Sequence, residues 1–217
     1  MKKASKLVVI SIILMTIFSL TSLFKIEVGG EKIGLASVSL IIGIVAFFVT
    51  RKTNDDVNEG LNFKNVFRLL KDKKVLFLVL MPAIMNVICF LIAKLFMPDF
   101  ITHLKARTDF LSFHMIPILL AQLIIFALGE EIAWRAFFQK QFSKMLPHVP
   151  SLIITAALFS LCHLNSGSTI VVIYDLLFVF INAIFYGMVF KRTDNACVST
   201  IAHFIANLLG TVLIMFL

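Results

Sequence analysis

Long apolar runs recur along this chain and constrain its fold more than any other feature. Six of them approach the roughly 20 residues that an α-helix needs to cross a bilayer, and they cover residues 7–24, 33–50, 75–97, 115–138, 169–190 and 196–217. A shorter run, 152–163, becomes a seventh span if residues on either side extend it. We therefore predict an all-α, polytopic transmembrane helix bundle with about seven spans, within a range of six to eight.

The chain offers no room for a soluble domain. It is 60% hydrophobic over 217 residues, which is more apolar surface than a single soluble core of that length can bury. Its longest polar stretch, 51–74, has an apolar stripe among lysines in its second half and is typical of a helix lying on the bilayer surface. We expect residues 1–74 to form two N-terminal spans plus this interfacial basic helix, and residues 75–217 to form the transmembrane core.

Lysine and arginine residues are distributed unevenly between alternate loops. If the N-terminus is cytoplasmic, fifteen of the twenty lie on the cytoplasmic side and four on the other, while Lys94 lies near a span end. This bias predicts a cytoplasmic N-terminus by the positive-inside rule. The net charge of +8 is then explained by topology and by attraction to anionic lipids of the bilayer. Because the basic residues are interleaved with spans, we expect no nucleic-acid partner.

Three ionisable side chains, Glu130, Glu131 and Arg135, interrupt the end of the apolar run 115–138. Such a group near a membrane helix centre costs roughly 2.5 to 3.5 kcal/mol, so it usually faces a protein interior or a water-filled cavity. Glu131 and Arg135 are four residues apart and can pair on one helix face. Glu130 has no such partner, and an unpaired carboxylate is suited to general-base work. The alternative is an interfacial helix end whose acidic side chains simply reach water.

Polar side chains also occur in two other apolar runs. His163 follows Phe159 by four residues, and Asn207 follows His203 by four. Taken singly, each is commonly a hydrogen-bonded packing residue between membrane helices. Taken with the acidic pair, they supply a base, two imidazoles and an amide, which are the groups needed to activate water and stabilise an oxyanion.

A further polar pair lies in the run 169–190. Asp175 and Asn182 are seven residues apart, which places them roughly on one face of a helix. They could line the same cavity as the other polar residues, and a role in packing is equally compatible with the spacing.

Three motifs occur in order along the chain: Glu-Glu-x-x-x-Arg at 130–135, Phe-x-x-x-His at 159–163 and His-x-x-x-Asn at 203–207. In this combination the chain resembles the CAAX protease and bacteriocin-processing family, also called the Abi family of intramembrane proteases. The resemblance covers roughly residues 115–210 and leaves the first two spans outside. It implies an integral membrane protein, and we expect it in a prokaryotic cell membrane.

The resemblance also implies a role for each motif residue. Glu130 would activate the attacking water with help from His163, while His203 and Asn207 would stabilise the oxyanion. Glu131, Arg135 and Phe159 would then support the site. We therefore predict no metal and no other cofactor. Family members are often described as metal-dependent, and a catalytic zinc held by Glu130, His163 and His203 is the alternative.

These inferences together predict an intramembrane endopeptidase that cleaves a membrane-associated peptide or protein within a cavity open toward the cytoplasm. Two other classes of function remain open. One is a non-catalytic bacteriocin self-immunity or peptide-binding membrane protein that keeps the polar cluster for binding. The other is a small ion- or proton-coupled transporter, which the lack of inverted repeats and of Gly- or Pro-broken spans disfavours.

Overall fold

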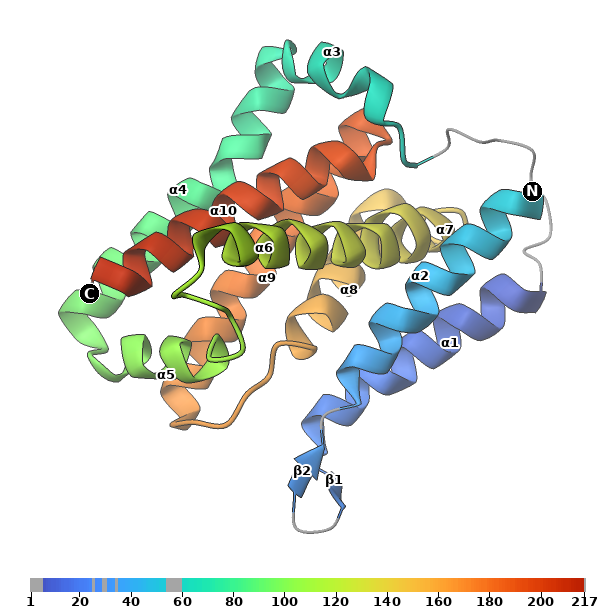
Figure 1. The fold of residues 1–217 in the computed structure, drawn as a ribbon. Helices are drawn as coiled ribbons and strands as arrows, with labels where there is room; N and C mark the ends of the chain where they lie inside the picture. The colour runs from blue at the N-terminus through green and yellow to red at the C-terminus, as the bar shows by residue number, and fades with distance from the viewer. Residues whose placement is uncertain (1–5, 25, 29–30, 34, 54–59, 217) are drawn as a thin grey trace.

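The computed structural model describes residues 6–24, 26–28, 31–33, 35–53 and 60–216, and this part of the chain is a helical bundle (Figure 1). Its main helices are α1 (Lys6–Leu20), α2 (Ala36–Thr53), α4 (Lys73–Phe96), α6 (Ile116–Glu131), α8 (His148–Leu161), α9 (Thr169–Thr193) and α10 (Ala196–Phe216). Shorter helices are η1 (Thr21–Leu23), η2 (Phe63–Asn65), α3 (Val66–Leu70), α5 (Asp99–Arg107), η3 (Ile132–Gln139) and α7 (Lys140–Phe142).

The number of spans agrees with the prediction. Five helical segments among the described residues are long and apolar enough to cross a bilayer: Lys6–Leu23, Lys73–Phe96, Ile116–Phe142, Thr169–Thr193 and Ala196–Phe216. Two further helices, α2 with 18 residues and the shorter apolar α8 with 14, bring the bundle to about seven. The all-α class and the integral membrane placement are thereby confirmed.

Two short elements were not predicted. β1 (Ile26–Val28) and β2 (Glu31–Ile33) pair antiparallel, with Ile26 opposite Ile33, and lie where α1 and α2 meet (Figure 1). The short helix α5, which was not predicted either, begins at Asp99, three residues after the end of α4. Elements of three to nine residues are too short for hydrophobic periodicity to identify, which explains why the sequence pattern missed them.

The predicted span 115–138 is not a uniform α-helix. After Glu131 the chain continues as a π-helix, η3, and all eight of its residues are buried. A π-helix pairs each N–H with the carbonyl five residues earlier, so it inserts an extra residue per turn and is often found at functional sites. A search for a 3.6-residue period cannot reveal such a change of pitch, because it assumes one pitch throughout.

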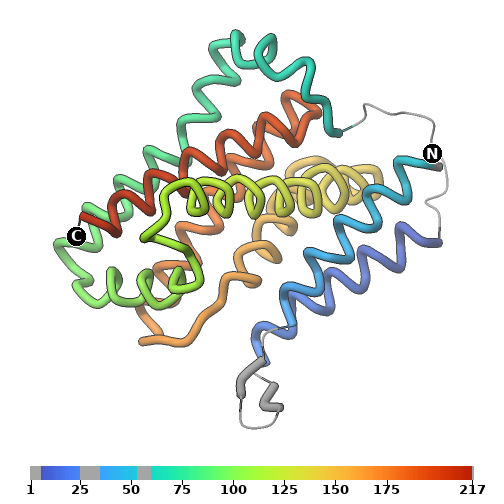
Figure 2. The backbone as a smooth tube through the Cα atoms, viewed as in Figure 1, coloured from blue at the N-terminus to red at the C-terminus, as the bar shows by residue number. Residues whose placement is uncertain are grey.

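The helix α8 ends before His163. Its last residue is Leu161, so the predicted extension of this span through His163 is wrong, and His163 lies in the segment that leads to α9. Figure 2 shows this segment running as an open loop toward the start of α9, near α5. His163 therefore lies just after the end of a helix rather than within one.

The N-terminal helices pack closely against the segment that follows the acidic pair. A Cβ on Gly43 of α2 would lie 2.6 Å from the Cβ of Ala133 and 2.8 Å from Met15, so only glycine permits this approach. One hydrophobic core contains buried residues of α1, α2, η3, α8, α9 and α10. Residues 1–74 and 75–217 therefore share this core rather than burying separate ones.

The start of α10 is fixed by the side chain of Asn195. Its Oδ1 accepts hydrogen bonds from the backbone N–H of Asn62 (3.1 Å) and Cys197 (3.1 Å), and its Nδ2 donates to Asn62 O (2.7 Å). The preceding residue, Asp194, ends α9 in the left-handed region at φ 45°. These contacts fix the start of α10, and with it the position of His203 two turns further along the helix.

Candidate active site

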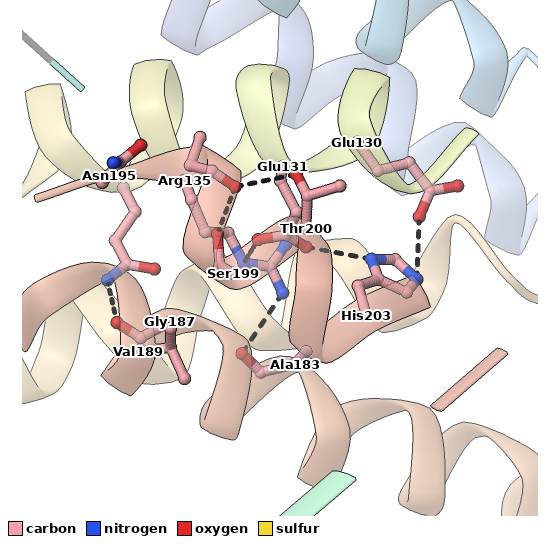
Figure 3. Close-up of polar contacts among 12 residues, drawn as sticks. Glu130, Glu131, Arg135, Ala183, Gly187, Val189, Asn195, Ser199, Thr200 and His203 are labelled. Atoms are coloured by element: carbon pink, nitrogen blue, oxygen red, sulfur yellow. Dashed lines mark hydrogen bonds and ion pairs between the residues drawn. The ribbon is translucent and has the colours of Figure 1, made fainter. Parts of the chain in front are cut away.

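His203 lies two turns into α10, with its ring buried between helices. Its Nδ1 is 3.0 Å from Glu131 Oε1, and its Nε2 is 3.6 Å from Glu130 Oε2 (Figure 3). The ring stacks on Tyr186 with centroids 4.4 Å apart and an interplanar angle of 15°. Because a carboxylate can only accept, Nδ1 carries the proton, and in a neutral ring Nε2 is then an acceptor facing Glu130.

Glu131 and Arg135 form an ion pair that is shut off from solvent. Arg135 Nε lies 3.4 Å from Glu131 Oε2, and both side chains have 0% exposure. Arg135 Nη2 donates to Ala183 O (3.2 Å), and the guanidinium lies over the rings of Phe159 (4.5 Å) and Tyr186 (5.5 Å). The predicted pairing of Glu131 with Arg135 is thus present. Glu131 also contacts His203, and we call Glu131, Arg135 and His203 the η3 cluster.

Glu130 differs from its neighbour in its surroundings. Its side chain is 23% exposed, whereas that of Glu131 is fully buried. Among the described residues its only ion-pair partner is His203 at 3.6 Å, which is too long for a hydrogen bond. Glu130 lines a cavity, and Glu131 does not. The two adjacent carboxylates therefore face different environments, one accessible and one enclosed.

His163 reaches the same cavity from the end of α8. Its Nδ1 lies 3.0 Å from Phe159 O. A carbonyl oxygen only accepts, so Nδ1 donates, and the neutral ring has an unprotonated Nε2. Phe159 is buried and packs against both imidazoles, with ring centroids 4.7 Å from His163 and 6.0 Å from His203. Phe159 thus contacts both histidines.

A single cavity of about 550 Å³ brings the predicted catalytic residues together, and it is lined by Glu130, His163, His203 and Asn207. Asn207 lies one turn after His203 on α10 and is half-buried. No hydrogen bond of its side chain occurs among the described residues. Its amide is therefore available to a molecule in the cavity. The roles of these residues in catalysis stay predictions.

A second group of polar residues borders the cavity, and two of its members, Arg107 and Asp175, line it. Asp175 Oδ2 accepts from Arg107 Nη1 (2.6 Å) and contacts His103 Nε2 (3.2 Å). We call these three residues the α5 cluster, because His103 and Arg107 belong to α5. Both Asp175 and Asn182 line the cavity, as one of the two interpretations of their spacing predicted. Asn182 donates from Nδ2 to Asn86 Oδ1 (2.7 Å).

The direction of the cavity conflicts with one expectation from the sequence. From Glu130 it extends toward the start of α2, α5 and the loop after α8, and residues of α3 and α7 do not line it. These two helices lie at the basic end of the bundle, which the charge bias places in the cytoplasm. A cytoplasmic N-terminus and a cavity that opens toward the cytoplasm therefore cannot both hold.

The alternative zinc set was tested against the geometry. Among the residues that the structure describes, no group of three or more His, Cys, Asp or Glu side chains is arranged to hold a metal ion. Glu130, His163 and His203 share the cavity, and both imidazole rings pack against Phe159. These residues as placed do not fit a zinc site, and we derive no step through one.

Sequence reasoning missed Tyr186, which forms the stacking surface for His203. A signal was available, because Tyr186 follows Asn182 by four residues and so continues the helix face that carries Asp175. Gln139 was also missed. It is buried in η3 and donates to Gly187 O (3.0 Å), which fixes η3 against α9.

Comparison with known proteins gave one match. Residues 112–209 match the family model described as "Type II CAAX prenyl endopeptidase Rce1-like", so this region belongs to that family and the resemblance inferred from the three motifs is confirmed. The match spans a little under half of the chain and includes all three motifs. No curated protein and no solved structure matched.

Proposed function

We propose that this member of a membrane protease family is an intramembrane endopeptidase, and that Glu130 activates the water that attacks the peptide bond. One observation carries the proposal: Glu130 Oε2 lies 3.6 Å from Nε2 of the buried His203 ring, in a cavity that also contains His163 and Asn207. The substrate is a membrane-associated peptide or protein, because the cavity lies within a bundle of membrane-spanning helices.

The geometry leaves room for a reacting atom between Glu130 and His203. A water or carbonyl oxygen makes hydrogen bonds of about 2.8 Å, and the 3.6 Å gap is shorter than two such bonds end to end. An atom can therefore lie to one side and contact both groups. In our proposal Glu130 takes a proton from water, and the free Nε2 of His163 assists by accepting a hydrogen bond from the same water.

The oxyanion is then stabilised by His203 and Asn207. For His203 to donate from Nε2, the ring must be protonated at both nitrogens. The amide of Asn207 supplies a second donor from one turn away on α10. Fixed donors of this kind act strongly in a site from which bulk water is excluded.

Glu131, Arg135 and Phe159 support this arrangement. Glu131 holds the His203 ring through Nδ1, and Arg135 compensates the charge of Glu131 where neither touches solvent. Phe159 packs on Arg135 and on both histidines. We assign these residues to positioning, since Glu131 and Arg135 do not reach the cavity.

The rival functions make different demands on the same residues. A peptide-binding immunity protein needs the cavity but no base beside a histidine. A proton-coupled transporter needs a path of titratable groups through the bundle, and the polar residues here end in two separate clusters. Hydrolysis is favoured because Glu130, His163, His203 and Asn207 all converge on one space.

Hydrolysis in ¹⁸O water tests the proposal. Purified full-length protein in liposomes is incubated with a membrane-anchored reporter peptide after exhaustive chelation. We expect two fragments, with ¹⁸O in the new carboxyl group. Absence of cleavage for every peptide tried would favour the binding function. Activity that vanishes on chelation and returns with added zinc would overturn metal-free activation of water by Glu130.

We further propose a cytoplasmic N-terminus with the cavity extending toward the opposite leaflet. Arg135 is buried in the bundle, so the basic residues in loops and at span ends number fourteen against four, which keeps the bias. In a background without the native cysteines, a thiol placed at Lys144 should react only after cytoplasmic access. One placed at Lys105 should react from outside. The reverse labelling would restore a cavity facing the cytoplasm.

A further inference from the structure

A groove lies on the surface where the start of α4 meets the end of α9. It has a volume of about 380 Å³ and is lined by Lys73, Lys74, Phe77, Leu78 and Arg192. None of these residues lines the catalytic cavity. The groove is therefore a separate site, which the proposed protease function does not use.

The basic side of the groove is held together by Asp72. One carboxylate oxygen accepts from the backbone N–H of Lys74 (2.8 Å), which caps α4, and the other accepts from Arg192 Nη2 (2.7 Å) at the end of α9. The Arg192 guanidinium holds the pKa of Asp72 below its usual value, so this carboxyl is charged at neutral pH. Three positive side chains and one negative one leave a net charge of +2 around the groove.

The two lysines are free to bind an anion. Both side chains are exposed, and neither has an ion-pair partner among the described residues. Asp72, in contrast, is engaged by Arg192 and by the α4 backbone. The unsatisfied positive charge of the groove therefore belongs to Lys73 and Lys74.

The other side of the groove is apolar and faces outward. Phe77 and Leu78 lie four residues after Lys73 and Lys74, so each lies below a lysine on the same helix face. Phe77 is 61% exposed, and exposed side chains continue along α4 at Leu80 and Ile84. Because α4 is long and apolar enough to cross a bilayer, we expect these side chains to face acyl chains and the lysines at its start to lie at headgroup level.

We propose that this groove binds an anionic phospholipid, with its phosphate between Lys73, Lys74 and Arg192 and an acyl chain along Phe77. The basic side chains of the groove complement the negative headgroup of the lipid, and its apolar side complements the hydrocarbon chains. Basic pockets between membrane helices at headgroup level are suited to such lipids. The bound lipid joins α4 to α9, the helix that carries Asp175 and Tyr186.

Native mass spectrometry of the full-length protein tests this proposal. The probe is phosphatidylglycerol, with phosphatidylcholine as its neutral counterpart. The protein should retain phosphatidylglycerol in preference to phosphatidylcholine. Replacing both lysines, in K73Q/K74Q, should weaken binding of phosphatidylglycerol about 30-fold, since each basic residue near an anionic lipid contributes about fivefold.

The matched control is K64Q/K71Q, which removes two exposed lysines near but outside the groove. This variant should bind phosphatidylglycerol like the wild type. Equal weakening in both variants would show attraction by net charge alone and overturn the site, as would unchanged binding in K73Q/K74Q. Complete displacement of the lipid by millimolar inorganic phosphate would show a site for a free anion. Both variants replace exposed side chains, and equal elution volumes confirm their fold.

Discussion

Two polar clusters that each border the cavity contain the same three chemical groups. In each cluster one carboxylate contacts one imidazole nitrogen and one guanidinium. The contacts are 3.0 and 3.4 Å in the η3 cluster and 3.2 and 2.6 Å in the α5 cluster. The first consists of Glu131, His203 and Arg135, and the second of Asp175, His103 and Arg107. Composition and contact distances therefore do not distinguish a reactive site from a structural one.

The difference lies in what faces the histidine. His203 has a second carboxylate, Glu130, 3.6 Å from its other ring nitrogen, and Asn207 one turn away. His103 does not line the cavity, and its side chain is 6% exposed. The α5 cluster thus pairs its charges within itself, whereas His203 of the η3 cluster lies in the cavity beside Glu130 and Asn207, which belong to neither cluster. This difference, rather than burial alone, marks the η3 cluster as the site of chemistry.

Glu130→Gln tests this difference with the largest expected effect. The substitution removes the base and keeps the shape, so cleavage should fall by about 10² to 10⁴-fold, the usual contribution of a general base. Membrane insertion and thermal stability should stay at wild-type levels, because the Glu130 side chain is 23% exposed and its contact with His203 is long, at 3.6 Å. Reporter cleavage and a thermal melt on the same sample measure both. Wild-type turnover would remove Glu130 from the mechanism.

Replacing the two paired acids should destabilise the protein to different extents. Glu131→Gln leaves Arg135 charged and fully buried, and loss of one partner of such a pair costs roughly 3 to 5 kcal/mol. Asp175→Asn should cost less, because the Arg107 side chain is 25% exposed and water can solvate it. Thermal unfolding in one detergent compares them. A larger loss for Asp175→Asn would show that the α5 cluster is the more important for the fold.

Much of this account could be predicted from the sequence, since the chemical pattern depends on residue spacing. Helical spacing predicts the pair Glu131 and Arg135. Glu130, His163, His203 and Asn207 lie on three separate elements, so their grouping in one cavity was predicted from their chemistry and the family resemblance rather than from spacing. The π-helix could not be predicted, because no composition or period distinguishes it from an α-helix. Nor could the α5 cluster, which depends on how two helices pack, 68 residues apart in sequence.

Asn207→Ala should lower kcat by about 10² to 10³, the usual loss for one oxyanion donor, with little change in KM. Asn182→Ala is the matched control, since it removes another amide from the same cavity wall. Steady-state kinetics on one reporter peptide separates kcat from KM. A rise in KM alone for Asn207→Ala would assign this residue to substrate binding instead.

Loss of the exposed ion pair between Asp72 and Arg192 should have the smallest effect on stability. Arg192 lowers the folded-state pKa of Asp72 below its unfolded value, so the pair stabilises the protein above the unfolded pKa. This contribution is lost as pH falls through the lowered, folded-state pKa. Melting temperatures of wild type and Asp72→Asn should therefore differ slightly at neutral pH and converge in acid. A difference that grows toward low pH would contradict this assignment.

The central claim is that two chemically alike clusters have different roles because a second carboxylate and an amide face only one of the histidines. Paired substitutions, His203→Gln and His103→Gln, test it most directly when cleavage is normalised to folded protein. We predict a loss of about 10² to 10⁴-fold for His203→Gln and a rate within twofold of wild type for His103→Gln. Equal losses in the two variants, or a larger loss for His103→Gln, would contradict the account.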